Sequence, residues 1–159
     1  FQRTFYALQQ DQLDRAESRL DLAIGSICGV VALMNSGDGP TNGFAYYLGV
    51  KHRVPHGLAG AIFLKEVMRY NHKNGYEKYA LLNPMRSTPL AKEVTAELLE
   101  EMDALYKQLR IPNLVPYGYG KGNVDEFAKN ASEALKGSFS GNPVPFTPES
   151  AREVIYQLT

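Results

Sequence analysis

The sequence predicts an all-α fold, a multi-helix bundle of about seven or eight helices that forms one domain over residues 1–159. Apolar residues recur at steps of three and four along most of the chain, which is the spacing of one helix face. No segment alternates apolar and polar residues convincingly over the length of a strand. Glycine and proline separate the apolar-periodic segments, as is typical of loops between helices.

The first helices are expected before Asn35. Residues 1–18 are polar and helical in character, and their inward positions are Phe1, Phe5, Leu8 and Leu13. The next segment, from Asp14 to Asn35, predicts a central buried helix, which Gly37 and the pair Gly39-Pro40 end. The single cysteine, Cys28, lies inside this apolar run, so we interpret it as a core thiol.

The middle of the chain predicts two helices joined by a loop. Thr41–Leu48 forms a short helix and Gly49–Val54 the loop. Pro55 fits the first turn of a further helix that continues to Asn71, because proline lacks the amide hydrogen that would be unpaired there. Tyr76–Leu82 predicts one more short helix.

The last part of the chain predicts three helices. Thr88-Pro89 begins the most amphipathic of them, whose inward positions are Val94, Leu98, Met102, Leu105 and Leu109. Asn123 followed by Glu126 resembles a capping box for a helix that ends near Leu135. Thr147-Pro148 caps a final helix that runs to the end of the chain.

Composition narrows the possible partners. Lys+Arg and Asp+Glu are both 17, so no net charge favours nucleic acid or an anionic membrane surface. The longest apolar run, Leu20–Met34, is about 15 residues, short of the roughly 20 that span a bilayer. The N-terminus lacks the features of a signal peptide, and one cysteine excludes an intramolecular disulfide. We therefore expect a cytoplasmic protein with a small-molecule partner; whether it forms a homo-oligomer stays open.

The segment from Asn35 to Asn71 has the composition of a functional site. It joins two helices through a turn-rich stretch that places four polar side chains near one another: Asn42, Tyr46, His52 and His56. A few residues would suffice to connect two helices, so a polar, glycine-rich stretch of this kind is costly to build for packing alone.

Several motifs in this stretch and beyond it resemble those of a known family. The order is Gly37-Asp38-Gly39, then Asn42-x-x-Ala45-Tyr46-x-x-Gly49, then Pro55-His56-Gly57-Leu58-Ala59. It continues with LKEVMRYN from Leu64, LYKQLRIP from Leu105, and Asn142-Pro143 to Thr147-Pro148-Glu149. These residues resemble the C-terminal helical domain of the iron-containing (group III) alcohol dehydrogenases, which belong to the dehydroquinate synthase-like superfamily.

The resemblance implies a two-domain enzyme. Its N-terminal nucleotide-binding domain, absent from these residues, would hold NAD(P), and a divalent metal, Fe or Zn, would lie between the domains. The family's last metal-binding histidine matches His56, and the ligand fourteen residues earlier falls on Asn42. A family histidine near the substrate falls on Tyr46, which would donate a hydrogen bond or a proton to a substrate oxygen.

Two departures from the family pattern bear on the metal. A catalytic divalent site takes at least three strong donors, whereas this chain offers one matched imidazole and the weak amide of Asn42. The family's Asp-x-x-x-His pair would precede residue 18, and no such pair occurs there. The loop ahead of His56 carries Lys51 and His52, which we assign to binding the substrate.

Three functions remain in competition at this stage. The first is an alcohol dehydrogenase that interconverts an alcohol and a carbonyl. The second is a dehydroquinate synthase-like cyclase or lyase of a sugar phosphate, and the third is a non-catalytic helical module. For His56 the simplest alternative is a polar residue that hydrogen-bonds the backbone at a helix start.

Overall fold

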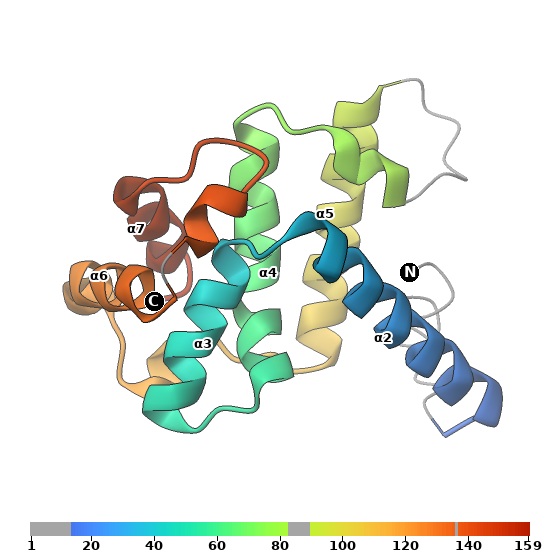
Figure 1. Ribbon diagram of the computed structural model, residues 1–159, viewed down its shortest axis with the longest axis horizontal. Coiled ribbons are helices and arrows are strands. Elements are labelled where there is room, and N and C mark those ends of the chain that lie inside the picture. Colours follow the sequence, from blue (N-terminus) through green and yellow to red (C-terminus); the bar gives the residue numbers. More distant parts are fainter. Residues whose placement is uncertain (1–13, 83–89, 136) are drawn as a thin grey trace. The chain divides into compact units, whose positions relative to one another are not determined.

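The structure, a computed structural model, describes residues 14–82, 90–135 and 137–159 (Figure 1). Every regular element within these ranges is helical, which confirms the predicted all-α fold. The described α-helices number six, against the seven or eight expected, and four short 3-10 helices accompany them. The α-helices are α2 (Ala16–Ser36), α3 (Pro40–His52), α4 (His56–Lys73), α5 (Ala91–Gln108), α6 (Val124–Ala134) and α7 (Pro148–Tyr156). The 3-10 helices are η1 (Lys78–Leu82), η2 (Val115–Tyr117), η3 (Lys121–Asn123) and η4 (Ser138–Gly141).

The chain divides into two compact units. The first comprises Phe1–Gly37 with Glu77–Leu109, and its described helices are α2, η1 and α5. The second comprises Asp38–Tyr76 with Arg110–Thr159 and holds the other helices. Every residue that the sequence assigns to the site lies in the second unit.

Three fully buried phenylalanines form the centre of the second unit. Phe44 of α3, Phe63 of α4 and Phe127 of α6 are each 0% exposed. The ring centroids of Phe44 and Phe63 are 5.0 Å apart, and those of Phe63 and Phe127 are 5.6 Å apart. Tilted rings at these separations attract one another in addition to the apolar surface they bury. This cluster therefore fixes α3, α4 and α6 against one another, and α7 packs on α4 and α6.

The pair α3 and α4 carries the predicted site, and the two helices pack against each other (Figure 1). Helix α3 is longer than predicted, because Lys51 and His52 form its last turn instead of a loop. The sequence predicted a helix that ends at Leu48, followed by a loop from Gly49 to Val54. Gly49 instead lies within α3, where the chain after the helix passes close to it. A Cβ added at this position would lie 3.3 Å from the carbonyl oxygen of Val54. Arg53, with φ +56°, then ends α3 in a left-handed conformation that its residue type does not predict.

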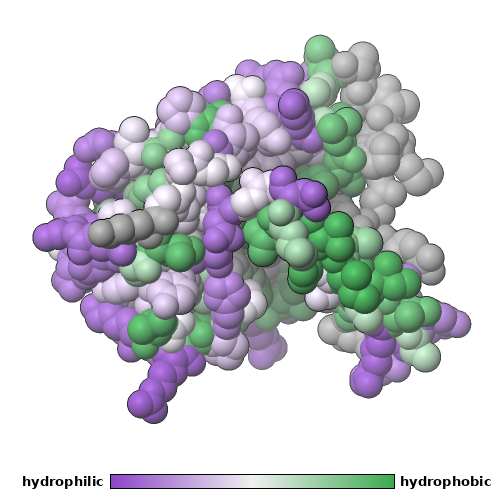
Figure 2. Space-filling model, viewed as in Figure 1, coloured by the Kyte–Doolittle hydropathy of each residue, from purple (hydrophilic) through white to green (hydrophobic). Residues whose placement is uncertain are grey.

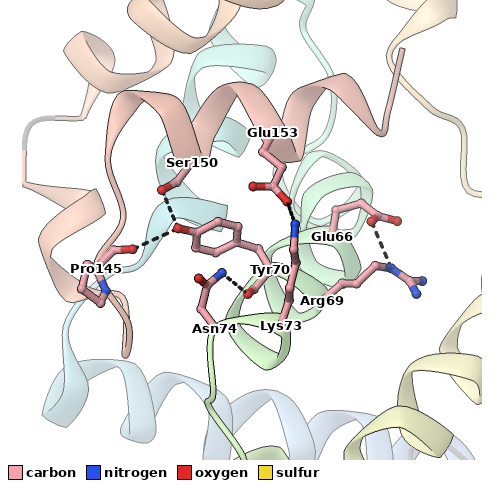
Figure 3. A network of polar contacts seen from close by, with 8 residues as sticks. All are labelled: Glu66, Arg69, Tyr70, Lys73, Asn74, Pro145, Ser150 and Glu153. Atoms are coloured by element: carbon pink, nitrogen blue, oxygen red, sulfur yellow. Dashed lines mark hydrogen bonds and ion pairs between the residues drawn. The ribbon is translucent and has the colours of Figure 1, made fainter.

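Polar contacts join α4 to α7 (Figure 3). The hydroxyl of Tyr70 donates to the carbonyl of Pro145 at 3.2 Å and lies 2.6 Å from the hydroxyl of Ser150. One turn further along α4, the ammonium group of Lys73 donates to the carboxylate of Glu153 at 2.6 Å. The contact between Tyr70 and Ser150 is partly buried and therefore stabilises the pair more than the exposed ion pair does.

The two predicted helix caps have different outcomes. Thr147 caps α7 as expected, since its hydroxyl accepts the backbone amide of Ser150 at 3.4 Å, although the helix ends at Tyr156 and not at the chain end. The prediction of a capping box at Asn123 is wrong. Asn123 precedes α6, but its side chain accepts the amide of Gly120 at 3.2 Å and makes no cap bond to the helix. A hydrogen bond within the preceding turn has competed successfully with the cap.

Asn71 and Asn142 form a reciprocal pair of side-chain hydrogen bonds. The amide of Asn71 donates to Asn142 at 3.0 Å, and the amide of Asn142 donates back at 2.6 Å. Asn71 is only 1% exposed, so removing either amide leaves a partner poorly satisfied. We expect Asn71→Ala to lower the free energy of unfolding by about 2 kcal/mol in urea titrations. Asn142→Ala should add little on top of it, and strictly additive losses in the double variant would contradict the pairing.

In the first unit, α5 confirms most of its predicted inward face. Val94, Leu98, Met102 and Leu105 are buried, whereas Leu109, just past the helix, is 38% exposed and was wrongly placed inward. The hydroxyl of Thr95, itself fully buried, donates to the carbonyl of Ala91 at 2.9 Å. The predicted helix start at Thr88-Pro89 and the inward residues before Asp14 lie outside the described residues.

The prediction of a buried helix over Leu20–Met34 is wrong for α2. Its apolar side chains are about half exposed or more, with Ile27 at 64% and Met34 at 80%, and Cys28 is exposed instead of being a core thiol. Figure 2 shows these apolar side chains gathered along the helix. Within the described part of the first unit, α2 packs extensively on neither η1 nor α5. The spacing of apolar residues thus identifies the apolar face of a helix, but it does not show whether another segment covers that face.

No single helix among the described residues is long and apolar enough to cross a membrane. The test of length and composition is met only when α2 and α3 are counted together across the break between them.

Candidate functional site

The residues that the family resemblance assigns to metal and substrate lie on the pair α3 and α4. Asn42 is in the first turn of α3 and half-buried, and Tyr46 is one turn later with 46% of its surface exposed. His56 is the first residue of α4, directly after Pro55 at the N-cap, and is exposed. None of the three is sealed in the phenylalanine core, so all remain available to a ligand or to another part of a larger protein.

The donor set for a divalent metal is incomplete in this part of the chain. Across residues 14–82, 90–135 and 137–159, no group of three or more His, Cys, Asp or Glu side chains could hold a metal ion. Asn42 offers an amide oxygen, a weak ligand for Fe or Zn, and His56 offers one imidazole. These two residues do not by themselves fit a catalytic metal.

Lys51 and His52, assigned to substrate binding, lie together with a group of residues that the sequence did not single out. Lys51 donates to the hydroxyl of Tyr47 at 2.9 Å and lies 3.5 Å from the carboxylate of Glu126 on α6. The Nε2 atom of His52 is 3.1 Å from the hydroxyl of Tyr119. We call this group the Tyr47 cluster, consisting of Tyr47, Lys51, His52, Tyr119, Glu126 and Asn130.

Tyr47 is at the centre of the cluster because three donors converge on its oxygen. Besides Lys51, the amide of Asn130 donates to it at 3.1 Å and the hydroxyl of Tyr119 at 3.3 Å. When Tyr119 donates in this direction, its own oxygen accepts from Nε2 of His52 in the tautomer that carries hydrogen there. A continuous chain of hydrogen bonds therefore leads from His52 through Tyr119 to Tyr47.

The protonation equilibria of the cluster follow from these contacts. Burial alone raises the pKa of Tyr47, but the hydrogen bonds from Lys51, Tyr119 and Asn130 outweigh it, so the pKa lies below the ordinary 10.0. Burial, followed by the contact with Tyr47, raises the pKa of Tyr119 to about 12. Its contacts with the two tyrosines, Tyr47 first, raise the pKa of Lys51 above the usual range.

Sequence reasoning did not connect Tyr47 with Lys51, although one pattern pointed to this contact. Tyr47 and Lys51 are four residues apart, which brings their side chains together on a helix. The spacing predicts this contact only when both residues are on one helix, and Lys51 was assigned to a loop. Tyr119 and Asn130, 72 and 83 residues from Tyr47, could not be found by local spacing at all.

Comparison with known proteins agrees with the resemblance. Residues 4–158 match the family described as "Fe-containing alcohol dehydrogenase family, C-terminal". The chain is 29% identical over 141 residues to lactaldehyde reductase of Escherichia coli (strain K12), covering 86% of this chain and 36% of that protein. It is 28% identical over 136 residues to 4-hydroxybutyrate dehydrogenase of Clostridium kluyveri, covering 85% of this chain and 37% of that protein.

A solved structure gives the same result for the fold. The crystal structure of a 1,3-propanediol oxidoreductase superposes with a TM-score of 0.64 at 25% sequence identity, covering 76% of this chain and 32% of that one. The chain thus spans about a third of the length of the relatives that it matches. Because the family match extends over nearly the whole sequence, the chain belongs to the Fe-containing alcohol dehydrogenase family and corresponds to its C-terminal region.

Proposed function

We propose that this chain is the substrate-side helical domain of an NAD(P)-dependent oxidoreductase that interconverts an alcohol and a carbonyl compound by hydride transfer. The observation that carries the proposal is the family match over residues 4–158. The relatives are named for lactaldehyde, 4-hydroxybutyrate and 1,3-propanediol, which are small alcohols or carbonyl compounds. A small-molecule substrate of this class also suits a chain with no net charge.

The proposal places the nucleotide-binding domain outside residues 1–159. The glycine-rich stretch that resembles a phosphate loop, residues 118–122, follows η2 and runs into η3. A dinucleotide-binding loop instead follows a strand and opens a long helix, whose N-terminus holds the pyrophosphate. NAD(P) would supply hydride acceptance and donation when bound to that other domain.

Within this chain we assign the ligand-binding roles to the pair α3 and α4. His56 and Asn42 would contribute two donors to a metal whose remaining ligands come from elsewhere in the full-length protein. Tyr46 would donate a hydrogen bond or a proton to the substrate oxygen. Lys51 and His52 would face the substrate from the last turn of α3, although an anionic substrate has to compete with Glu126 for Lys51.

Turnover by the full-length protein tests the proposal. We expect net formation of reduced nicotinamide when the protein is incubated with NAD⁺ or NADP⁺ and short alcohols such as 1,2- or 1,3-propanediol. Turnover of a sugar phosphate without net reduced cofactor would instead favour the cyclase. If the protein turned over no alcohol or carbonyl compound in either direction, the result would favour the third hypothesis, a non-catalytic helical module.

A further inference from the structure

Helix α2 is apolar on two opposite sides. From Leu22 to Met34 it contains no charged residue. One side carries large side chains at steps of three and four, each between 50% and 80% exposed: Leu20, Ile24, Ile27, Val31 and Met34 (Figure 2). The other side carries Gly25 and Gly29. Gly29 follows Leu20 by about two and a half helical turns, which places the two residues on opposite sides of the helix.

Gly29 leaves space beside α2 that the described residues do not use. Glycine within a helix is less favourable than alanine, because its backbone loses more freedom on folding. A Cβ added at Gly29 would meet nothing within 4 Å beyond the backbone of its own helix. The distance between two packed helices depends on the side chains at their contact, so a glycine here allows a second helix to approach closely.

The described part of the first unit buries neither side of α2. The helix packs extensively on neither η1 nor α5. Val30 and Leu33, which lie between the two sides, are 54% and 48% exposed. Contiguous exposed apolar surface marks an interaction site, and a helix that is apolar on all sides is normally buried in the core of a larger structure.

We infer that α2 is the central helix of a larger helix bundle in the full-length protein, where helices from outside residues 1–159 cover both of its sides. The relatives have enough additional chain for this, since the match covers 36% of lactaldehyde reductase and 32% of the 1,3-propanediol oxidoreductase chain. One covering helix would pack an apolar face between Ile27, Val31 and their neighbours, and another would approach closely over Gly29. The inference goes beyond the reaction proposed above and does not depend on it.

Other occupants fit the two-sided pattern less well. In a symmetric dimer, a second copy meets α2 through one continuous surface, so it covers one side and leaves the opposite side in water. A helix that lies on a bilayer turns a charged face toward water, and the stretch from Leu22 to Met34 has no such face. Helices of the same polypeptide can cover both sides at once.

The thiol of Cys28 reports whether α2 is covered. Cys28 is exposed and lies in the middle of the apolar stretch. In the native full-length protein we expect it to react with a small maleimide at least about 100-fold more slowly than in urea, because a covered thiol reacts only after local opening. Mass spectrometry of tryptic peptides assigns the label to Cys28. Lys129→Cys, at an exposed position of α6, is the matched control and should react nearly as fast in the native as in the unfolded protein.

Gly29→Ala tests the second side by the sign of its effect on stability. On an open helix surface this exchange raises the urea midpoint, since alanine is the better helix former. Under a closely packed helix the added methyl group overlaps with its neighbour, so we expect the midpoint of the full-length protein to fall. A higher midpoint would mean that the side of Gly29 is open to water, which would overturn the inference.

Each contrary labelling result has its own meaning. If Cys28 reacted as fast in the native as in the unfolded protein, α2 would be uncovered and the inference wrong. Protection that is lost when the protein dissociates on dilution would assign α2 to a second copy, and protection that appears only with phospholipid vesicles would assign it to a bilayer. Either result would overturn the inference. A protein that protects Cys28 but turns over no alcohol would support the inference and contradict only the proposed function.

Discussion

Phe44→Ala should lower the free energy of unfolding by about 4 kcal/mol, roughly a thousandfold change in the folding equilibrium. Phe44 is 0% exposed, and its ring lies 5.0 Å from Phe63 and 5.4 Å from Phe139, measured between centroids. Removing it costs the apolar transfer energy of the ring and leaves a cavity lined by rigid aromatic side chains that cannot collapse fully. Urea unfolding followed by far-ultraviolet circular dichroism measures the loss as a lower midpoint.

A matched variant on the same helix controls for helix propensity. Val50 of α3 is 69% exposed, so Val50→Ala should change stability by no more than about 0.5 kcal/mol. If the two variants unfold at the same midpoint, Phe44 is not at the centre of the core. The comparison is valid where both proteins unfold in a two-state manner with equal dependence on urea.

The sequence predicted those parts of the fold that depend on local pattern. The inward face of α5, the glycine that ends α2 and the threonine cap of α7 each follow from a spacing or a residue type within a few positions. The exposure of α2 does not, because a helix with an apolar face looks the same in sequence whether or not a neighbour covers it. Its packing depends on which other segments reach it, and periodicity does not contain that information.

The candidate site divides in the same way. His56 at the start of α4 and Asn42 in the first turn of α3 were placed on helices by a proline and by residue spacing, and the helices are where they were expected. The predicted end of α3 at Leu48 was wrong, and this error moved Lys51 off the helix that brings it to Tyr47. Contacts of Tyr47 with Tyr119 and Asn130 required the folded chain, since they join segments far apart in sequence.

The second prediction with a large expected effect concerns the binding of the metal by the full-length protein. His56→Ala should abolish metal retention, because it removes the only strong donor that this chain matches to the family pattern. Loss of a residue that merely orients a metal ligand typically lowers affinity 10- to 100-fold, so loss of a ligand itself should lower it at least about as much. Elemental analysis of the purified protein provides the readout without any need for activity.

His72→Ala is the matched control, since His72 lies in the last turn of the same helix α4 and should not affect metal content.

Asn42→His tests the same geometry in the opposite direction. Exchanging an amide for an imidazole gives Fe or Zn a stronger ligand, so metal affinity should rise if the side chain at position 42 faces the ion. Unchanged metal content in His56→Ala, together with no gain in Asn42→His, would mean that α3 and α4 do not line the inherited metal site. A higher metal affinity of Asn42→His would mean that position 42 is the inherited ligand position. The natural asparagine there would then provide a weaker ligand than the family's histidine.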